Sequence, residues 1–118
     1  MSFRGLLMSL FNRNSLKTLP PQEVKDLLDR QAIHLVDVRE AHEWTDGHIP
    51  GAIHRPLSEL SKWAGGLPQD KPVIFYCLSG GRSGQALSAC KSAGHAVEGH
   101  MGGGISAWRM QGLPVTRG

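Results

Sequence analysis

The segment 73–83 constrains the fold of this chain more than any other. Residues 73–76 (Val-Ile-Phe-Tyr) are β-branched and aromatic, which is typical of a buried strand, whereas residues 83–93 have helical spacing. Cys77 and a glycine-rich turn separate the two. The sequence therefore predicts a strand, a tight turn and a helix in direct succession, with Cys77 at the carboxyl end of the strand. In open α/β sheets, ligands bind at that edge.

The turn after Cys77 has the composition of an anion-binding loop. Gly80 and Gly81 permit backbone conformations that are closed to other residues, so that successive N–H groups can converge on one point. The following helix adds the positive end of its dipole, and Arg82 adds a permanently charged guanidinium. Since such surroundings lower the pKa of a cysteine from ~8.5 to roughly 3.5–7.5, Cys77 is predicted to be largely a thiolate and hence a nucleophile. A buried, inert cysteine is the alternative, which the glycines and Arg82 disfavour.

Strands and helices are expected to alternate along the rest of the chain. Further strands are predicted at residues 33–36, 52–53 and 96–98, and helices from Pro20-Pro21 through Leu28 and at residues 40–45, 57–64 and 105–111. The strand at 33–36 would deliver Asp37 to its carboxyl end. Alternation of this kind favours an α/β fold with a mostly parallel sheet that is covered by helices on both sides.

Several motifs surround the Cys77 loop in a fixed order. Before it come Asp37-Val38-Arg39-Glu40, Glu43-Trp44 and Gly-His-Ile-Pro-Gly-Ala at 47–52; after it come Gly103-Gly104-Ile105 with Ala107-Trp108, and Gly-Leu-Pro-Val at 112–115. This series resembles a single-domain rhodanese, from about Lys17 to Val115. The resemblance implies a rhodanese-like fold with a mostly parallel, five-stranded central sheet and helices on both faces. It also implies sulfur transfer through a cysteine persulfide.

The resemblance assigns a role to each residue of the loop. Cys77 would accept the sulfur, and Arg82 would bind and neutralise the donor. Asp37 and Arg39 would brace the loop from the end of the neighbouring strand. Gly102 stands where relatives often carry a charged or bulkier residue, and it is expected to widen the mouth of the cleft. The N–H groups expected to hold the sulfane sulfur or the anionic end of the donor are those of Leu78, Ser79, Gly80, Gly81, Arg82 and Ser83.

These roles predict a thiosulfate sulfurtransferase-type enzyme. Thiosulfate or a persulfide would donate sulfur, and cyanide, a small thiol or the cysteine of a partner protein would accept it, with neither a cofactor nor a metal. A phosphatase or arsenate reductase on the same fold is one alternative. It is disfavoured because phosphatases of this fold carry one residue more between cysteine and arginine than the four at 78–81. A non-catalytic sulfur carrier or interaction module is the other, against which the intact Cys77 and Arg82 argue.

The first 16 residues are expected to form an arm outside a domain that comprises residues 17–118. Apolar residues recur there at helical spacing, which predicts a short amphipathic helix. Contact of residues 2–13 with a membrane surface is one alternative for this helix. We favour packing on the domain or on a second copy, or fraying in solution. The apolar residues of the arm are Phe3, Leu6, Leu7, Leu10 and Phe11.

Composition excludes several other classes. With 118 residues, of which 40% are hydrophobic, the chain can bury the core of one domain and not of two. Two cysteines do not make a disulfide framework, and a nucleophilic thiolate needs a reducing compartment, so a cytoplasmic protein is expected. The net charge of +3 comes without a basic patch interleaved with aromatics, so nucleic-acid binding is not expected. The six histidines are scattered, which disfavours a metal site, and Cys90 is predicted to be a packed core thiol.

Overall fold

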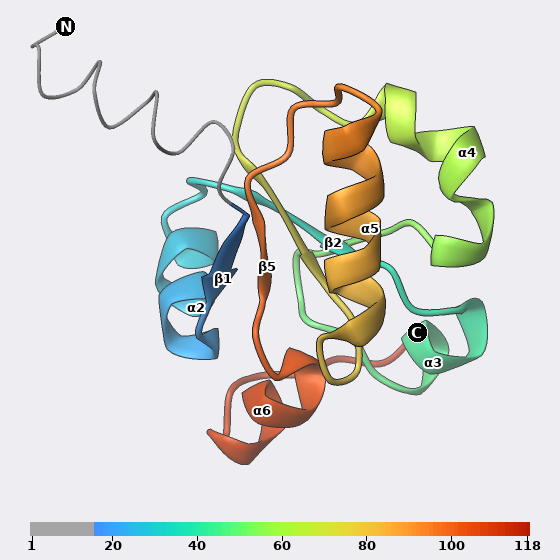
Figure 1. Ribbon diagram of the computed structural model, residues 1–118. Coiled ribbons are helices and arrows are strands. Elements are labelled where there is room, and N and C mark those ends of the chain that lie inside the picture. Colours follow the sequence, from blue (N-terminus) through green and yellow to red (C-terminus); the bar gives the residue numbers. More distant parts are fainter. Residues whose placement is uncertain (1–15) are drawn as a thin grey trace, which may run out of the picture.

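Five parallel strands form a single sheet in the computed structural model, which describes residues 16–118. The expected arm helix and the boundary after residue 16 concern residues 1–15, which lie outside the described part. The sheet has the order β1-β5-β4-β2-β3 and confirms the α/β class with a five-stranded parallel sheet (Figure 1). Its strands are β1 (Lys17–Leu19), β2 (His34–Asp37), β3 (Ile53–His54), β4 (Val73–Tyr76) and β5 (Gly99–Met101).

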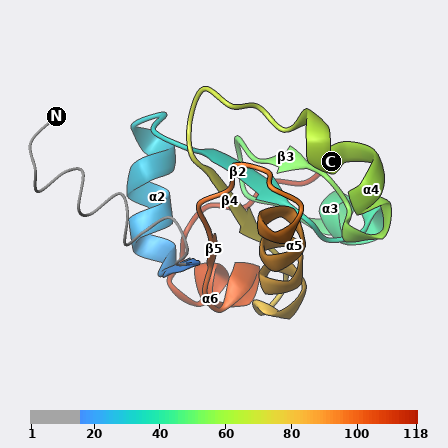
Figure 2. The same cartoon turned by 45° about the horizontal axis from the view of Figure 1, so that its top comes forward.

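Helices cover both faces of this sheet, as expected (Figure 2). Helices α2 (Pro21–Asp29) and α6 (Gly104–Met110) pack on one face, and α4 (Leu60–Trp63) and α5 (Gly81–Ser92) pack on the other. Helix α3 (Ala41–Asp46) follows β2. The 3₁₀ turns η1 (Leu57–Glu59) and η2 (Ala64–Gly66) flank α4, so the helix expected at 57–64 is broken into three short pieces.

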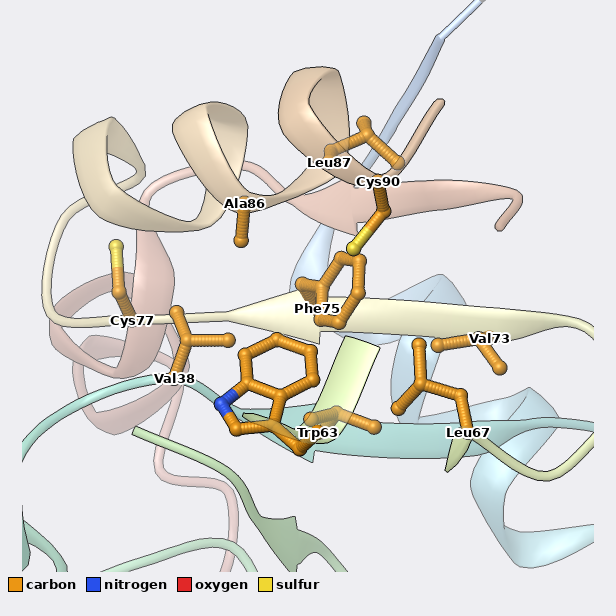
Figure 3. Packing of buried hydrophobic residues seen from close by; sticks show 10 residues of the cluster. Val38, Trp63, Leu67, Val73, Phe75, Cys77, Ala86, Leu87 and Cys90 are labelled. Atoms are coloured by element: carbon orange, nitrogen blue, oxygen red, sulfur yellow. The ribbon is translucent and has the colours of Figure 1, made fainter. Parts of the chain in front are cut away.

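Each face of the sheet carries its own hydrophobic core. On the side of α4 and α5, Phe75 of β4 packs together with Trp63, Cys90 and Cys77, the residue that follows β4 (Figure 3). On the side of α2 and α6, Tyr76 packs with Trp108. All four residues of β4 are buried, because successive side chains enter opposite cores. This explains the continuous apolar run of that strand, and the burial of Cys90 agrees with its expected place in a core.

The edge of the sheet differs from the expectation. The last strand lies at Gly99–Met101 rather than at 96–98, and it pairs with β1, a strand that was not predicted at Lys17–Leu19. The close approach of the two backbones explains the error. A Cβ atom at Gly99 would lie 2.5 Å from the carbonyl oxygen of Lys17, so a glycine is needed here to admit the neighbouring strand.

Candidate active site

Cys77 follows β4 directly and lies at the carboxyl edge of the sheet, where α5 begins four residues later. Gly80 caps α5 with a φ of 118°, a conformation that favours glycine. This turn reverses the chain tightly enough to bring the first turn of α5 over the end of β4. Figure 3 shows the sulfur of Cys77 pointing toward that first turn.

Hydrogen-bond donors converge on the Cys77 sulfur. The amides of Gly80 and Ser83 donate to Sγ at 3.1 and 3.3 Å, and the Ser83 hydroxyl oxygen lies 3.5 Å from it. Burial by itself raises the pKa of this thiol, but the Ser83 hydroxyl and the amides of Ser83, Gly80 and Ser79 outweigh it, so that the net pKa is lowered. The loop therefore stabilises a thiolate at the start of a helix.

The sulfur is less accessible than the sequence suggested. Cys77 is only 1% exposed, whereas the next residue, Leu78, is 46% exposed. The Cys77 side chain points to the α5 side of the sheet and joins the core that contains Val38 and Phe75. A reacting group must therefore approach past the exposed part of the loop, residues 78, 79 and 81.

Arg82 is engaged by Glu43, a residue to which the sequence motifs assigned no role of its own. The Nη1 and Nη2 atoms of Arg82 donate to Oε1 and Oε2 of Glu43 on α3 at 2.6 and 2.8 Å. The hydrogen bond and charge of Glu43 raise the pKa of Arg82, and the charge of Cys77 adds to this. The guanidinium thus lies within electrostatic reach of the thiolate but is already paired. The signal in the sequence was the position of Glu43 in the motif before Trp44.

Asp37 and Arg39 form a buried ion pair at the end of β2. Arg39 Nε and Nη2 donate to the Asp37 carboxylate at 3.0 and 2.7 Å, and Nη2 also donates to the carbonyl oxygen of Gly47 at 2.7 Å. The guanidinium carbon lies 5.7 Å from the centre of the Tyr76 ring. These contacts hold Tyr76, the residue that precedes Cys77, and the turn at Gly47. That the pair braces the loop 78–83 stays a prediction.

Helix α6 closes the site from the other side. The amides of Ile105 and Ser106 donate to the carbonyl oxygens of Cys77 and Leu78 at 2.9 and 3.1 Å. Gly104 permits this approach, because a Cβ atom there would lie 2.3 Å from the Leu78 oxygen. A Cβ atom at Gly102 would instead meet the Thr18 methyl group at 2.8 Å. Gly102 therefore packs beside β1, and the expected widening of the cleft mouth stays a prediction.

His100, on β5, is a second site residue that sequence reasoning did not single out. Its Nδ1 atom lies 2.8 Å from the Ser83 hydroxyl and its Nε2 atom lies 3.3 Å from the Thr18 hydroxyl. Single histidines without ligand spacing carried no signal, and the pairing of β5 with β1 that builds this contact was not foreseen.

Within residues 16–118, no group of three or more His, Cys, Asp or Glu is placed to hold a metal ion. No helix of the same range is long and apolar enough to cross a membrane.

Comparison with known proteins decides the family. The Rhodanese-like domain family matches residues 20–111, a range that includes the Cys77 loop, Glu43 and the Asp37–Arg39 pair. The chain belongs to this family. Its rhodanese-like domain is 42% identical over 100 residues to the probable adenylyltransferase/sulfurtransferase MoeZ of Mycobacterium tuberculosis, covering 82% of this chain and 26% of MoeZ. The chain thus spans about a quarter of that relative.

Two further matches are similar in size to this chain. A protein named sulfurtransferase from Allochromatium vinosum is 36% identical over 90 residues, covering 76% of this chain and 84% of its own. A solved structure from Rhodopseudomonas palustris, described as a protein of unknown function and possible tyrosine phosphatase, superposes on the rhodanese-like domain with a TM-score of 0.78 at 30% identity. It covers 98% of this chain and 97% of its own.

Proposed function

We propose that this rhodanese-like domain is a sulfurtransferase in which Cys77 carries the transferred sulfur as a persulfide. The observation that supports this most directly is the convergence of the Gly80 amide, the Ser83 amide and the Ser83 hydroxyl on Sγ. Donors placed in this way stabilise negative charge on sulfur, which a nucleophile needs before attack and regains after transfer. Relatives named sulfurtransferases support the same class of reaction.

The reaction proceeds in two displacement steps. The Cys77 thiolate attacks the sulfane sulfur of thiosulfate or of a persulfide, and a new S–S bond forms at Cys77. The old S–S bond breaks, and its electron pair leaves with sulfite or with the donor thiolate. A cyanide ion, a small thiolate or a cysteine thiolate of a partner protein then attacks the outer sulfur, and Cys77 departs as a thiolate. The amides of Gly80 and Ser83 serve both steps, because Sγ carries negative charge before the first step and regains it in the second.

The loop geometry also bears on the phosphatase alternative, which the description of the R. palustris structure raises again. Four residues separate Cys77 from Arg82, and the Gly80 amide already lies within hydrogen-bond distance of Sγ. A group as small as one sulfur atom suits this arrangement better than a tetrahedral phosphate. We therefore propose sulfur as the cargo, and the cytoplasm as the compartment that keeps the thiol reduced.

Intact-protein mass spectrometry tests this proposal directly. The wild-type chain is exposed to thiosulfate, measured, treated with cyanide and measured again. We expect a gain of one sulfur atom that cyanide removes, in the wild type and in Cys90→Ala, but not in Cys77→Ala. The Cys90→Ala variant is the matched control, because both cysteines are buried in the same core. Absence of the gain with both thiosulfate and a persulfide donor, or Cys77-dependent hydrolysis of an aryl phosphate, would contradict the proposal.

A further inference from the structure

A line of polar groups joins the buried sulfur to the surface. Sγ of Cys77 is 3.5 Å from the Ser83 hydroxyl, which is 2.8 Å from His100 Nδ1, and His100 Nε2 is 3.3 Å from the hydroxyl of Thr18. The first two residues are almost fully buried, His100 is half-buried and Thr18 is exposed. Cys77 directly follows β4, and the other three residues lie on α5, β5 and β1, so the sheet order itself builds the line.

The burial of Cys77 makes such a line relevant to its chemistry. A thiol that is 1% exposed and packed beside Val38 and Phe75 has little direct contact with water that could take its proton. Ionisation of the thiol needs a route for that proton. Ser83 Oγ can accept the S–H hydrogen and can pass its own hydrogen on, because a hydroxyl is both donor and acceptor.

We propose that Ser83 and His100 relay the thiol proton of Cys77 to the surface at Thr18. The inference rests on the proposed function only in that Cys77 must ionise. The S–H proton moves to Ser83 Oγ while the Ser83 hydroxyl proton moves to His100 Nδ1. The proton on Nε2 then moves to Thr18 Oγ1, whose own proton passes to water. One proton enters and one leaves Ser83, His100 and Thr18, so the net change is a Cys77 thiolate, a hydronium ion in solvent and a His100 ring whose hydrogen has moved from Nε2 to Nδ1.

After the relay, the same residues hold the thiolate. His100 now carries its hydrogen on Nδ1, which donates to Ser83 Oγ, and the Ser83 hydroxyl is free to donate to Sγ. Before the relay, the hydrogen bonds run the other way: the thiol donates to Ser83 Oγ, and the Ser83 hydroxyl donates to His100 Nδ1. The Gly80 carbonyl oxygen, at 3.2 Å, is a further acceptor for this hydroxyl. Burial lowers the pKa of His100, which keeps a lone pair on the ring for the incoming proton. His100 is thus a positioning residue that acts on the sulfur through Ser83.

Other charges near His100 are balanced by partners. Lys17 on β1 pairs with Glu98 at 2.7 Å, and Arg82 at the start of α5 pairs with Glu43. Lys91 lies two turns of α5 beyond Ser83, toward the other end of the helix. β4 presents the apolar Phe75 at the register position beside His100. A shift of the pH profile when His100 is replaced is therefore assigned to the imidazole and Cys77.

The test measures the rate at which iodoacetamide alkylates Cys77 as a function of pH, in a Cys90→Ala background so that one thiol reports. After the relay, the hydrogen bonds from His100 to Ser83 and from Ser83 to Sγ stabilise the thiolate, so the loss of His100 should raise the pKa of Cys77. Because a shift of one pKa unit changes the thiolate fraction tenfold, we expect His100→Asn to slow alkylation about tenfold on the acidic side of the profile. Ser83→Ala should do the same, and the double variant should be no slower than the Ser83 variant, since both cut one line. His95→Asn, which removes a half-buried histidine outside the line, should leave the profile unchanged.

Thr18→Val provides a second variant that removes only the terminal hydroxyl at an exposed position. It should shift the profile in the same direction as His100→Asn, by less. Superimposable profiles for wild type, His100→Asn and Thr18→Val, or additive effects of His100→Asn and Ser83→Ala, would overturn the relay. Alkylation needs no sulfur donor, so a normal relay in a protein that never gains sulfur would refute the proposed function alone. A sulfur gain with unshifted profiles would refute the relay alone.

Discussion

Arg82 and Glu43 form a bidentate ion pair between the first turn of α5 and helix α3. The two N–O distances are 2.6 and 2.8 Å, and the side chains are 35% and 19% exposed. The Glu43 carboxylate also accepts a hydrogen bond from the amide of Glu40 at 3.1 Å, as part of the capping box of α3. The N-terminus of α3 thus fixes the position of the Glu43 carboxylate. The arginine expected to receive an anionic donor is therefore held and largely neutralised by a carboxylate.

This pairing predicts that Glu43 selects between donors. Glu43→Gln leaves Arg82 with an uncompensated charge, which should raise kcat/KM for the dianion thiosulfate about three- to tenfold relative to an alkyl persulfide, which carries less charge, as expected for roughly 1 kcal/mol from a part-exposed charge. Arg82→Ala should change the ratio in the opposite direction. Steady-state rates with the two donors measure it. Glu59→Gln, which removes an exposed carboxylate on η1, is the control. An equal change for both donors would show that the pair has a purely structural role.

The same ion pair predicts a pH dependence of stability. Arg82 is the main cause that lowers the pKa of Glu43 from 4.5 to about 2. A carboxylate with a depressed pKa stabilises the fold above its unfolded pKa and loses that contribution as the pH falls from 4.5 toward 2. Allowing for solvent screening at Arg82, the loss should be about 2 kcal/mol. Urea unfolding at a series of pH values measures it, and Glu43→Gln should give a flatter curve. Parallel curves for the two proteins would contradict the prediction.

The buried pair at the end of β2 predicts a larger effect. Asp37→Asn leaves Arg39, which is 4% exposed, without its charged partner. Leaving one charge of a buried pair uncompensated costs about 3–5 kcal/mol. Urea denaturation of the variant measures this loss. The double variant Asp37→Asn/Arg39→Met removes both charges and should recover part of the stability. A single variant that loses less than ~1 kcal/mol would show that Gly47 and Tyr76 suffice to hold Arg39.

The sequence predicted the centre of this fold better than its edge. Two segments at the centre were predicted from local patterns, and the structure confirms both: the apolar strand 73–76, which is buried on both faces, and the glycine turn after Cys77 that leads into α5. Lys17–Leu19 carries none, because three residues are too few to show a period, and the strand exists only through its pairing with β5. The strand predicted at 96–98 was misplaced for a similar reason. The need for a glycine at position 99 comes from its contact with Lys17, which is distant in sequence.

The candidate site divides in a similar way. The loop geometry around Cys77 depends on residues close in sequence, and the composition of the loop indicated it. Glu43 and His100 depend on contacts across 39 and 17 residues, which no local pattern specifies. The burial of Cys77 likewise depends on Val38 and Phe75, which belong to two different segments. Long-range packing therefore determines which charges and protons surround the sulfur, and the sequence alone left that open.

The close approach of α6 to the loop gives a last prediction, with a control that the chain itself supplies. Gly104 has a φ of 58°, and a Cβ atom there would lie 2.3 Å from the Leu78 carbonyl oxygen and 2.5 Å from that of Cys77. Gly112 has a φ of 71°, and a Cβ atom there would meet nothing within 4 Å. Both alanine variants incur about 1–2 kcal/mol of left-handed strain, but only Gly104→Ala also pushes α6 off the loop.

We therefore expect Gly104→Ala to lose about 2 kcal/mol more than Gly112→Ala in urea denaturation. It should also slow alkylation of Cys77, because the amides of Ile105 and Ser106 would no longer fix the Cys77 and Leu78 carbonyls. Gly112→Ala should leave that rate unchanged. If the two variants lost the same stability and were alkylated at the same rate, Gly103 and Gly104 would serve only the turn into α6. A selective loss at Gly104 would show that α6 holds the nucleophile's backbone in place.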